Sequence, residues 1–230
     1  MARRLYDLSA RDDRRFSSYC WRARFALAHK GLDAEIVPVS FGEKDKIAFS
    51  GQPLVPVLVE DGQTIPDSWK IACHLEEKHP SRPSLFGGAV GQAEALFINH
   101  WCDKIVQPAL APGLMFSIFQ KVRPEDQAYF RESREKRFGH SLETLHAERE
   151  THVANFRKVI EPARAVLATQ PFLAGDAPRY ADYILAGTLQ FARLAYKDDV
   201  LAADDPVRAW RDRVFDLFGR MAASVPAAAA

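Results

Sequence analysis

The sequence predicts two structural units, a small α/β domain followed by a larger all-helical domain. Strand-like segments alternate with helical ones only within about the first 80 residues. The segment HPSRPSLFGG, residues 79–88, contains two prolines and two glycines and is typical of a linker. Beyond it, apolar residues recur at helical spacing and no segment has the alternation of a strand. We therefore expect domains at residues 1–80 and 91–230, joined by a linker at 81–90.

The first domain is predicted to have the order β-α-β-(α)-β-β-α. A strand, a crossing helix and a second strand indicate a parallel pair with a right-handed crossover, and the final hairpin adds antiparallel strands. This is the order of a thioredoxin-like sheet. The expected elements are a strand in RLYDL, a helix from Ser18 to Lys30 stopped by Gly31, a strand in AEIVPVSF, a short helix or loop in KDKIAF, two strands within PLVPVLVEDGQTIPDSW, and a helix from Ser68 to about His79.

The second domain is predicted from apolar periodicity alone. Pro108 and Pro112 should kink or break its first helix, because proline lacks the amide hydrogen that a helix interior uses. The expected helices cover residues 92–120, 125–150, 153–169, 181–196 and 206–222.

Composition argues against several classes of function. A formal net charge of +1 provides no basic field for nucleic acid or for an anionic membrane. No run of 18 apolar residues predicts a membrane span, and the first residues do not have the pattern of a secretory signal. The three cysteines are odd in number and scattered, which favours a cytoplasmic protein over a disulfide framework. The seven histidines show no paired metal-binding spacing, so we expect no metal.

Two hydroxyl residues, Ser17 and Ser18, stand directly before an apolar helical segment. Serine is favoured at the N-cap, so the simplest interpretation is that the pair starts the helix. The alternative is that a hydroxyl also holds a reactive group at the helix tip. The spacing alone does not decide between them.

Two further segments have both a structural and a binding interpretation. If Pro56 stands at a strand start, the backbone of Val55 is left unpaired and can bond an extended peptide; otherwise Pro56 is a loop proline. Asp67 and Ser68 are suited to cap the following helix. The same helix N-terminus can receive a carboxylate, because its amides are free and its dipole end is positive.

Taken together, these motifs resemble those of a glutathione transferase. The resemblance rests on SSxxWRxRxAL, GxxLVPVL and DSWxIAxxLEEKxP, followed by an all-α half. The later segments YFRESREKRFG, LAGDAPRYADYILA and DDPVRAWRDRVFDLF resemble the bacterial β-etherase branch, which is related to fungal-type transferases and cleaves aryl ethers with glutathione. The similarity extends over nearly the whole chain.

The resemblance implies that glutathione is the cosubstrate and assigns roles to several of these residues. Val55 and Pro56, at a cis-proline, would pair with its cysteinyl part, and Asp67 and Ser68 would hold its γ-glutamyl end. Ser17 matches the catalytic serine, with Ser18 as the alternative. Pro53 and Leu54 occupy the place of the basic residue that often grips the glycine carboxylate, so Lys44, Lys46 and Gln52 are the substitutes.

The implied chemistry suits these residue types. A free thiol has a pKa of about 8.5, and a hydroxyl that donates to the thiolate stabilises it by roughly 1.5–3 kcal/mol. Cys20 lacks the partner of a C-x-x-C redox pair, since Ser17 occupies the nucleophile's place, and we interpret it as a core residue. Arg179 replaces the usual cap residue before Asp182, so Asp182 is expected to bond backbone amides directly.

The expected function is a transferase in which the thiolate attacks an apolar, aromatic electrophile, with aryl ether cleavage as the branch-specific form. The alternatives are a general conjugating or peroxide-reducing transferase and a non-catalytic binder of aromatic ligands. The resemblance also implies a homodimer.

Overall fold

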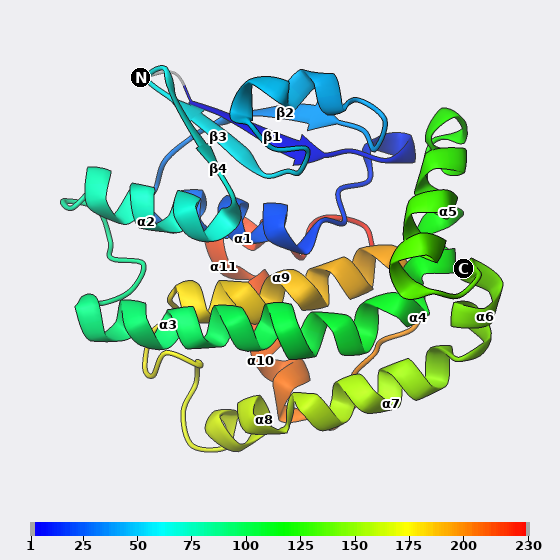
Figure 1. Ribbon diagram of the computed structural model, residues 1–230. Helices are drawn as coiled ribbons and strands as arrows, with labels where there is room; N and C mark the ends of the chain where they lie inside the picture. The colour runs from blue at the N-terminus through cyan, green and yellow to red at the C-terminus, as the bar shows by residue number, and fades with distance from the viewer. Residues whose placement is uncertain (1–2, 229–230) are drawn as a thin grey trace.

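A computed structural model describes residues 3–228 of the chain. Its first domain contains one four-stranded sheet of order β2-β1-β3-β4 (Figure 1). β1 (Arg3–Leu8) pairs in parallel with β2 (Glu35–Val39) and antiparallel with β3 (Val57–Glu60), and β3 forms a hairpin with β4 (Gln63–Pro66). The predicted parallel pair and antiparallel hairpin are confirmed, and so is the thioredoxin-like domain followed by a helical one.

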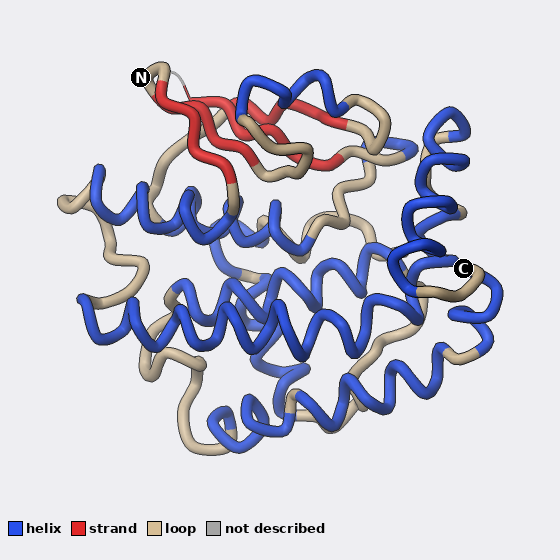
Figure 2. The backbone as a smooth tube through the Cα atoms, viewed as in Figure 1, coloured by secondary structure: helices blue, strands red, loops and turns tan. Residues whose placement is uncertain are grey.

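Two helices lie between the sheet and the second domain. α1 (Ser18–His29) and α2 (Ser68–Lys78) cover one face of the sheet, while η2 (Lys44–Ser50) lies toward the opposite face (Figure 2). The predicted helix at Ser18 is therefore covered on both sides, which explains why apolar residues around it, such as Trp21, Ala23 and Phe25, are all buried.

The first domain is fixed to the second mainly by the packing of α1 on α9 (Tyr180–Ala195). Gly187 permits this close approach, because a Cβ atom there would lie 2.5 Å from the Ser18 carbonyl oxygen. A side chain at this position would therefore displace the N-terminus of α1.

The second domain is helical, as expected, but its helices are shorter. Gly139, in the left-handed conformation at φ 73°, ends one helix inside the expected span 125–150. Pro162 lies in the first turn of a new helix inside the span 153–169, and the last span is broken after Phe215. The helices are α3 (Ala89–Trp101), α4 (Gln107–Phe119), α5 (Pro124–Phe138), α6 (Leu142–Ala147), α7 (Arg149–Val159), α8 (Glu161–Leu167), α9, α10 (Pro206–Phe215) and α11 (Leu217–Arg220).

The kink or break expected at Pro108 and Pro112 is replaced by a distortion just before both prolines, and the chain stays helical through them. α3 passes into α4 through a π turn at Cys102–Val106. Pro108 lies in the first turn of α4, where proline is tolerated, and Pro112 lies inside that helix.

Across the described part of the chain, no helix has the length and apolar character that crossing a bilayer requires.

Candidate active site

Ser17 is the N-cap of α1 and also lines two neighbouring cavities. Its Oγ accepts a hydrogen bond from the Cys20 amide at 3.3 Å. A hydroxyl has one donor hydrogen and two acceptor lone pairs, so the cap itself does not use the O–H, whose neighbour within the chain is the Cys20 sulfur. Ser18 is 3% exposed and lines only the second of the two cavities.

The first cavity has a volume of about 370 Å³ and lies between the sheet domain and α5. It brings together six of the eight site residues predicted from the sequence, which are Ser17, Lys44, Gln52, Val55, Pro56 and Asp67. The remaining lining residues are Leu8, Tyr19, Val39, Ser40, Phe41, Ile47, Pro53, Leu54, Tyr129, Arg134 and Arg137.

The Val55–Pro56 peptide bond in the wall of this cavity is cis. β3 begins only at Val57, and within residues 3–228 neither the amide nor the carbonyl of Val55 has a hydrogen-bond partner. The Pro56 carbonyl is already occupied, because it accepts from the Asp67 amide at 3.1 Å. An extended peptide would therefore find one donor and one acceptor at Val55.

Asp67 caps α2 and keeps one carboxylate oxygen available. Its Oδ1 accepts from the amides of Trp69 and Lys70 at 3.0 and 3.1 Å, and the residue is exposed. No described residue bonds the second oxygen, which can therefore meet a cation. Ser68 is 1% exposed and lines neither cavity, although its carbonyl is held by the Tyr180 hydroxyl at 2.8 Å.

The second cavity, of about 210 Å³, lies between α1 and the helices of the second domain. Six residues line both cavities, namely Leu8, Ser17, Tyr19, Phe41, Arg134 and Arg137. Deeper in, its walls are mostly apolar. They include Phe16, which precedes α1, and residues of α4, α5 and α9, namely Ala111, Met115, Ile118, Phe130, Phe138 and Phe191. A group bound beside Ser17 would therefore face an apolar chamber.

Four polar residues that line these cavities were not predicted as site residues, namely Tyr19, Tyr129, Arg134 and Arg137. Tyr19 is half-buried, and burial raises the pKa of its hydroxyl, with Asp103 adding to the rise. Lys44 lies 4.2 Å from the centre of the Tyr129 ring, and its hydrogen bond lowers the pKa of that tyrosine. The i, i+3 spacing of Arg134 and Arg137, which places both on one face of α5, was the available signal in the sequence.

Asp182 anchors α9, and its predicted bonds to backbone amides are present. One carboxylate oxygen accepts from the Leu173 amide at 2.7 Å and from the Trp210 indole at 2.9 Å, and the other accepts from the Arg179 amide at 3.0 Å. The carboxylate is completely buried and ties three segments of the second domain together.

None of the three cysteines lines either of the two cavities. Cys20 is 1% exposed, and burial raises the pKa of its thiol well above the ordinary value, which agrees with a core role. Cys20, Cys73 and Cys102 are all unpaired. Among residues 3–228 there is no group of three or more histidine, cysteine or acidic side chains arranged to hold a metal ion.

Comparison with known protein families identifies both domains. A glutathione S-transferase N-terminal domain model matches residues 13–83, and a glutathione S-transferase C-terminal domain model matches residues 93–222. The chain belongs to the glutathione S-transferase family. Glutathione S-transferase 4 of Zea mays is 30% identical over 177 residues, which cover 72% of this chain and 69% of the maize protein.

Other relatives of this chain match over shorter regions. A glutathione S-transferase zeta class protein of Euphorbia esula is 34% identical over 120 residues, which cover 48% of this chain and 52% of the relative. A probable maleylacetoacetate isomerase of Caenorhabditis elegans is 38% identical over 96 residues, 40% of this chain and 45% of the relative. The match thus spans about half the length of these two relatives.

Solved structures with the same fold also match this chain. Glutathione transferase GSTFuA3 of Phanerochaete chrysosporium superposes with a TM-score of 0.82 over 93% of this chain and 96% of its own, at 19% sequence identity. A glutathione S-transferase of Rhodospirillum rubrum has a TM-score of 0.71 over 93% of this chain and 88% of its own, at 29% identity.

Proposed function

We propose that this transferase activates glutathione as a thiolate at Ser17 and directs it at an electrophilic carbon in the second cavity. The observation that carries the proposal is the position of Ser17. This residue lines both cavities, and the helix cap does not use its hydroxyl hydrogen. A donor to the thiolate contributes roughly 1.5–3 kcal/mol, and the helix terminus adds about 0.3–1 kcal/mol. Together they make the thiolate a major species near neutral pH.

Glutathione would lie in the first cavity along three contacts. The unpaired amide and carbonyl of Val55, beside the cis Pro56, pair with its cysteinyl backbone. The start of α2 holds the γ-glutamyl end, Asp67 through its second oxygen, which faces the ammonium group, and the buried Ser68 through its backbone at the helix N-terminus.

Lys44 is the stronger candidate for the glycine carboxylate of glutathione. Both Lys44 and Gln52 line the first cavity, but the Gln52 side-chain amide already donates to the Leu54 carbonyl at 2.9 Å. Lys44 carries a full charge and has no carboxylate partner within residues 3–228. A charged donor to a carboxylate is stronger than a neutral one.

The apolar chamber supports a second substrate with an apolar, aromatic body. In the ether-cleaving form of the reaction, the thiolate attacks the carbon that bears the aryl oxygen, and a phenoxide leaves with the electron pair of the broken bond. The relative described as a probable maleylacetoacetate isomerase favours an isomerase activity as a second candidate function.

The deciding experiment is turnover of glutathione with 1-chloro-2,4-dinitrobenzene and, separately, with a β-aryl ether, compared with ligand displacement from the same protein. Release of chloride or phenol in proportion to glutathione consumed supports a transferase. Reduction of an organic hydroperoxide in place of both reactions would favour a peroxide-reducing transferase. Displacement of aromatic ligands without any turnover would favour a non-catalytic binder.

We also propose a cytoplasmic homodimer. α3 exposes Val90 and Phe97, which are 74% and 72% exposed and seven residues apart on one helical face. The first domain exposes Phe49 and Leu54, at 52% and 66%. In the twofold arrangement of related transferases, the first domain of one chain packs on the helices of the other, which would cover both pairs. The unpaired cysteines suit a reducing compartment.

A further inference from the structure

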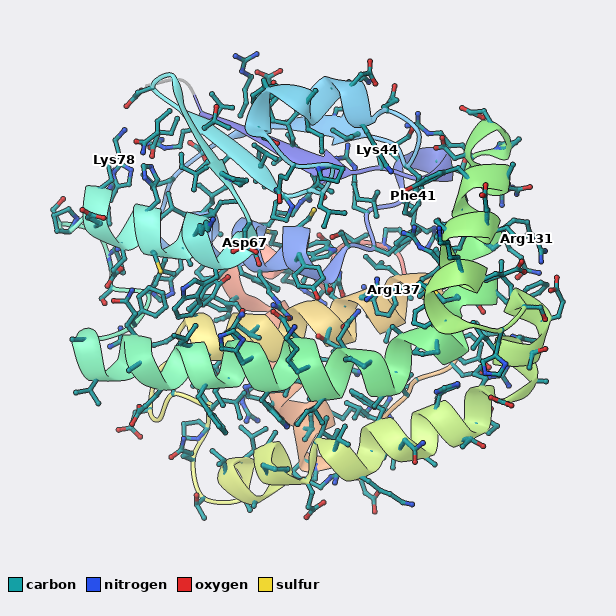
Figure 3. The ribbon with its side chains drawn as sticks, in the orientation of Figure 1. Phe41, Lys44, Asp67, Lys78, Arg131 and Arg137 are labelled. Atoms are coloured by element: carbon teal, nitrogen blue, oxygen red, sulfur yellow. The ribbon has the colours of Figure 1, made fainter. Side chains whose placement is uncertain are left out.

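Two arginines of α5, Arg134 and Arg137, line both cavities at their junction. They are three residues apart and therefore project from the same side of the helix. In Figure 3, Arg137 lies on the side of α5 that faces α1, whereas Arg131 lies on the outer side. The two guanidinium groups thus border the place where the second substrate would enter.

Neither guanidinium is neutralised within the described residues. Arg131, on the outer side, pairs with Glu135 and Glu143, each at 2.8 Å. Arg134 instead donates to the Ser133 hydroxyl at 2.9 Å, and no carboxylate of residues 3–228 lies within ion-pair distance of Arg134 or Arg137. A charge next to an apolar chamber normally has a partner.

The rings around Arg134 hold its guanidinium group in place. It lies over the Phe41 ring at 5.2 Å and over the Phe130 ring at 4.6 Å. Burial lowers the pKa of Arg134, which indicates a partly desolvated charge. The Arg134 guanidinium already bonds the Ser133 hydroxyl and the Tyr129 side chain, and its remaining edge hydrogens are available for a planar acceptor such as a carboxylate.

The one carboxylate that lines the second cavity does not cancel these charges. Asp103 accepts from Arg22 at 2.8 Å and from Asn99 at 3.0 Å. Arg22 is completely buried, so its charge and that of Asp103 balance each other. The junction therefore retains the charge of two arginines.

Glutathione does not require these two arginines. This step rests on the proposed function, in which Lys44 receives the glycine carboxylate and the start of α2 receives the γ-glutamyl end. The anionic partner of Arg134 and Arg137 must then come from the second substrate.

We propose that the second substrate is an anion, with an apolar body that enters the second cavity and a carboxylate that Arg137 and Arg134 bind at its mouth. The apolar walls accept the body, and the charged rim selects for the carboxylate. An electrophile with only apolar substituents leaves the two guanidinium groups unpartnered and is the poorer substrate.

The test compares 4-chloro-3-nitrobenzoate with its methyl ester, two aryl electrophiles that differ in charge. In each, the glutathione thiolate forms a carbon–sulfur bond, and chloride leaves with the electrons of the carbon–chlorine bond. Because the ester is intrinsically more reactive, each kcat/KM is divided by the rate constant for free glutathione. In the wild type this normalised value should be at least about 10-fold higher for the carboxylate.

Arg137→Gln should reduce that preference about 10-fold, since it removes the charge of an exposed side chain whose guanidinium lies 5.3 Å from the centre of the Phe138 ring. Arg137→Lys retains the charge and should restore part of the preference. Lys136→Gln is the matched control, because it removes a charge from the adjacent, exposed position outside both cavities. Arg134→Lys keeps the charge but loses the planar fork and should lower the preference too.

Three results would overturn the proposal. An equal normalised rate for the acid and the ester would show that charge is not recognised. If Lys136→Gln lowered the preference for the carboxylate as much as Arg137→Gln does, the preference would come from the net charge of the protein and not from Arg137. The third result is that Arg137→Gln leaves the preference for the carboxylate intact and raises the KM for glutathione or the pKa of the bound thiol. That result would show that Arg137 binds glutathione and not the second substrate. In all three cases the ester is still converted, whereas no conversion of either compound would instead reject the proposed function.

Discussion

The hydroxyl of Ser17 can cap α1 and bind a thiolate at the same time, because the cap uses only a lone pair. Ser17→Ala should raise the pKa of bound glutathione by about one to two units and slow turnover at neutral pH about 10–100-fold. It should also lower the free energy of unfolding by about 0.5–2 kcal/mol through loss of the cap. Thiolate absorbance against pH and urea unfolding measure the two effects separately.

Two neighbouring variants serve as controls for this prediction. Ser17→Thr keeps a hydroxyl and should retain part of the effect on the thiol pKa. Ser18→Ala should change it less, because Ser18 is buried and does not line the first cavity. A thiol pKa that responds to Ser18→Ala and not to Ser17→Ala would transfer the role to Ser18.

At the scale of elements, the start of α9 depends on Asp182. Asp182→Ala would leave the amides of Leu173 and Arg179 and the indole of Trp210 without an acceptor in a buried site. We expect the free energy of unfolding to fall by about 3 kcal/mol or more, measured by urea denaturation. Asp176→Ala removes an exposed carboxylate from the preceding loop and should have little effect. Similar losses in both variants would contradict a specific role for Asp182.

The contact between β3 and α2 depends on a second buried carboxylate, Glu60. It accepts from His74 at 2.7 Å, from His79 at 2.9 Å and from Arg3, and Lys78 lies 3.9 Å away. Burial by itself raises the pKa of Glu60, but the hydrogen bonds from these partners outweigh it and lower the pKa from 4.5 to about 2. The cluster therefore stabilises the fold only while Glu60 is ionised.

Because the pKa of Glu60 is lower in the folded chain, its contribution is complete above about pH 4.5 and is lost as the pH falls toward 2. Its size is about 3 kcal/mol. Glu60→Gln should therefore be less stable than the wild type at pH 5 and nearly equal to it at pH 2, measured by urea unfolding at each pH. A stability difference that does not change over this range would refute the assignment.

At the scale of the whole molecule, the exposed apolar face of α3 predicts an interface between two copies. Phe97→Glu places a charge on this face and should shift the protein from dimer to monomer at micromolar concentration, measured by light scattering. Val166→Glu adds the same charge to a 37% exposed position of α8 and should leave the dimer intact. A monomeric wild-type protein would refute the interface.

Local patterns in the sequence determine which elements form and in what order. The strands, α1, α2 and α9 are predictable because each has its own apolar period and its own start and stop residues. The interruptions in the second domain are harder to predict. Helical spacing continues across Gly139 and Pro162, and whether the chain bends there depends on packing.

Site residues are predictable only where they belong to short sequence motifs. Ser17, Val55 and Asp67 stand at element ends, so their backbone roles follow from local rules. Ser17, Val55 and Asp67 meet around one cavity, and Arg134 and Arg137 reach it from a helix of the second domain. Both depend on how α5 and α9 pack against the first domain. His74 and His79 illustrate the same limit, because no local motif indicates that they bond to the buried Glu60.

The sequence by itself thus determined the two-domain fold and the resemblance to glutathione transferases. The fold follows from local periodicity, and the resemblance follows from motifs of a few residues. The tertiary structure alone decided which side chains share a cavity, which charges stay unpaired and which carboxylates are buried. The physical reason is that burial and charge pairing are properties of contacts between distant segments, and local sequence does not encode those distances.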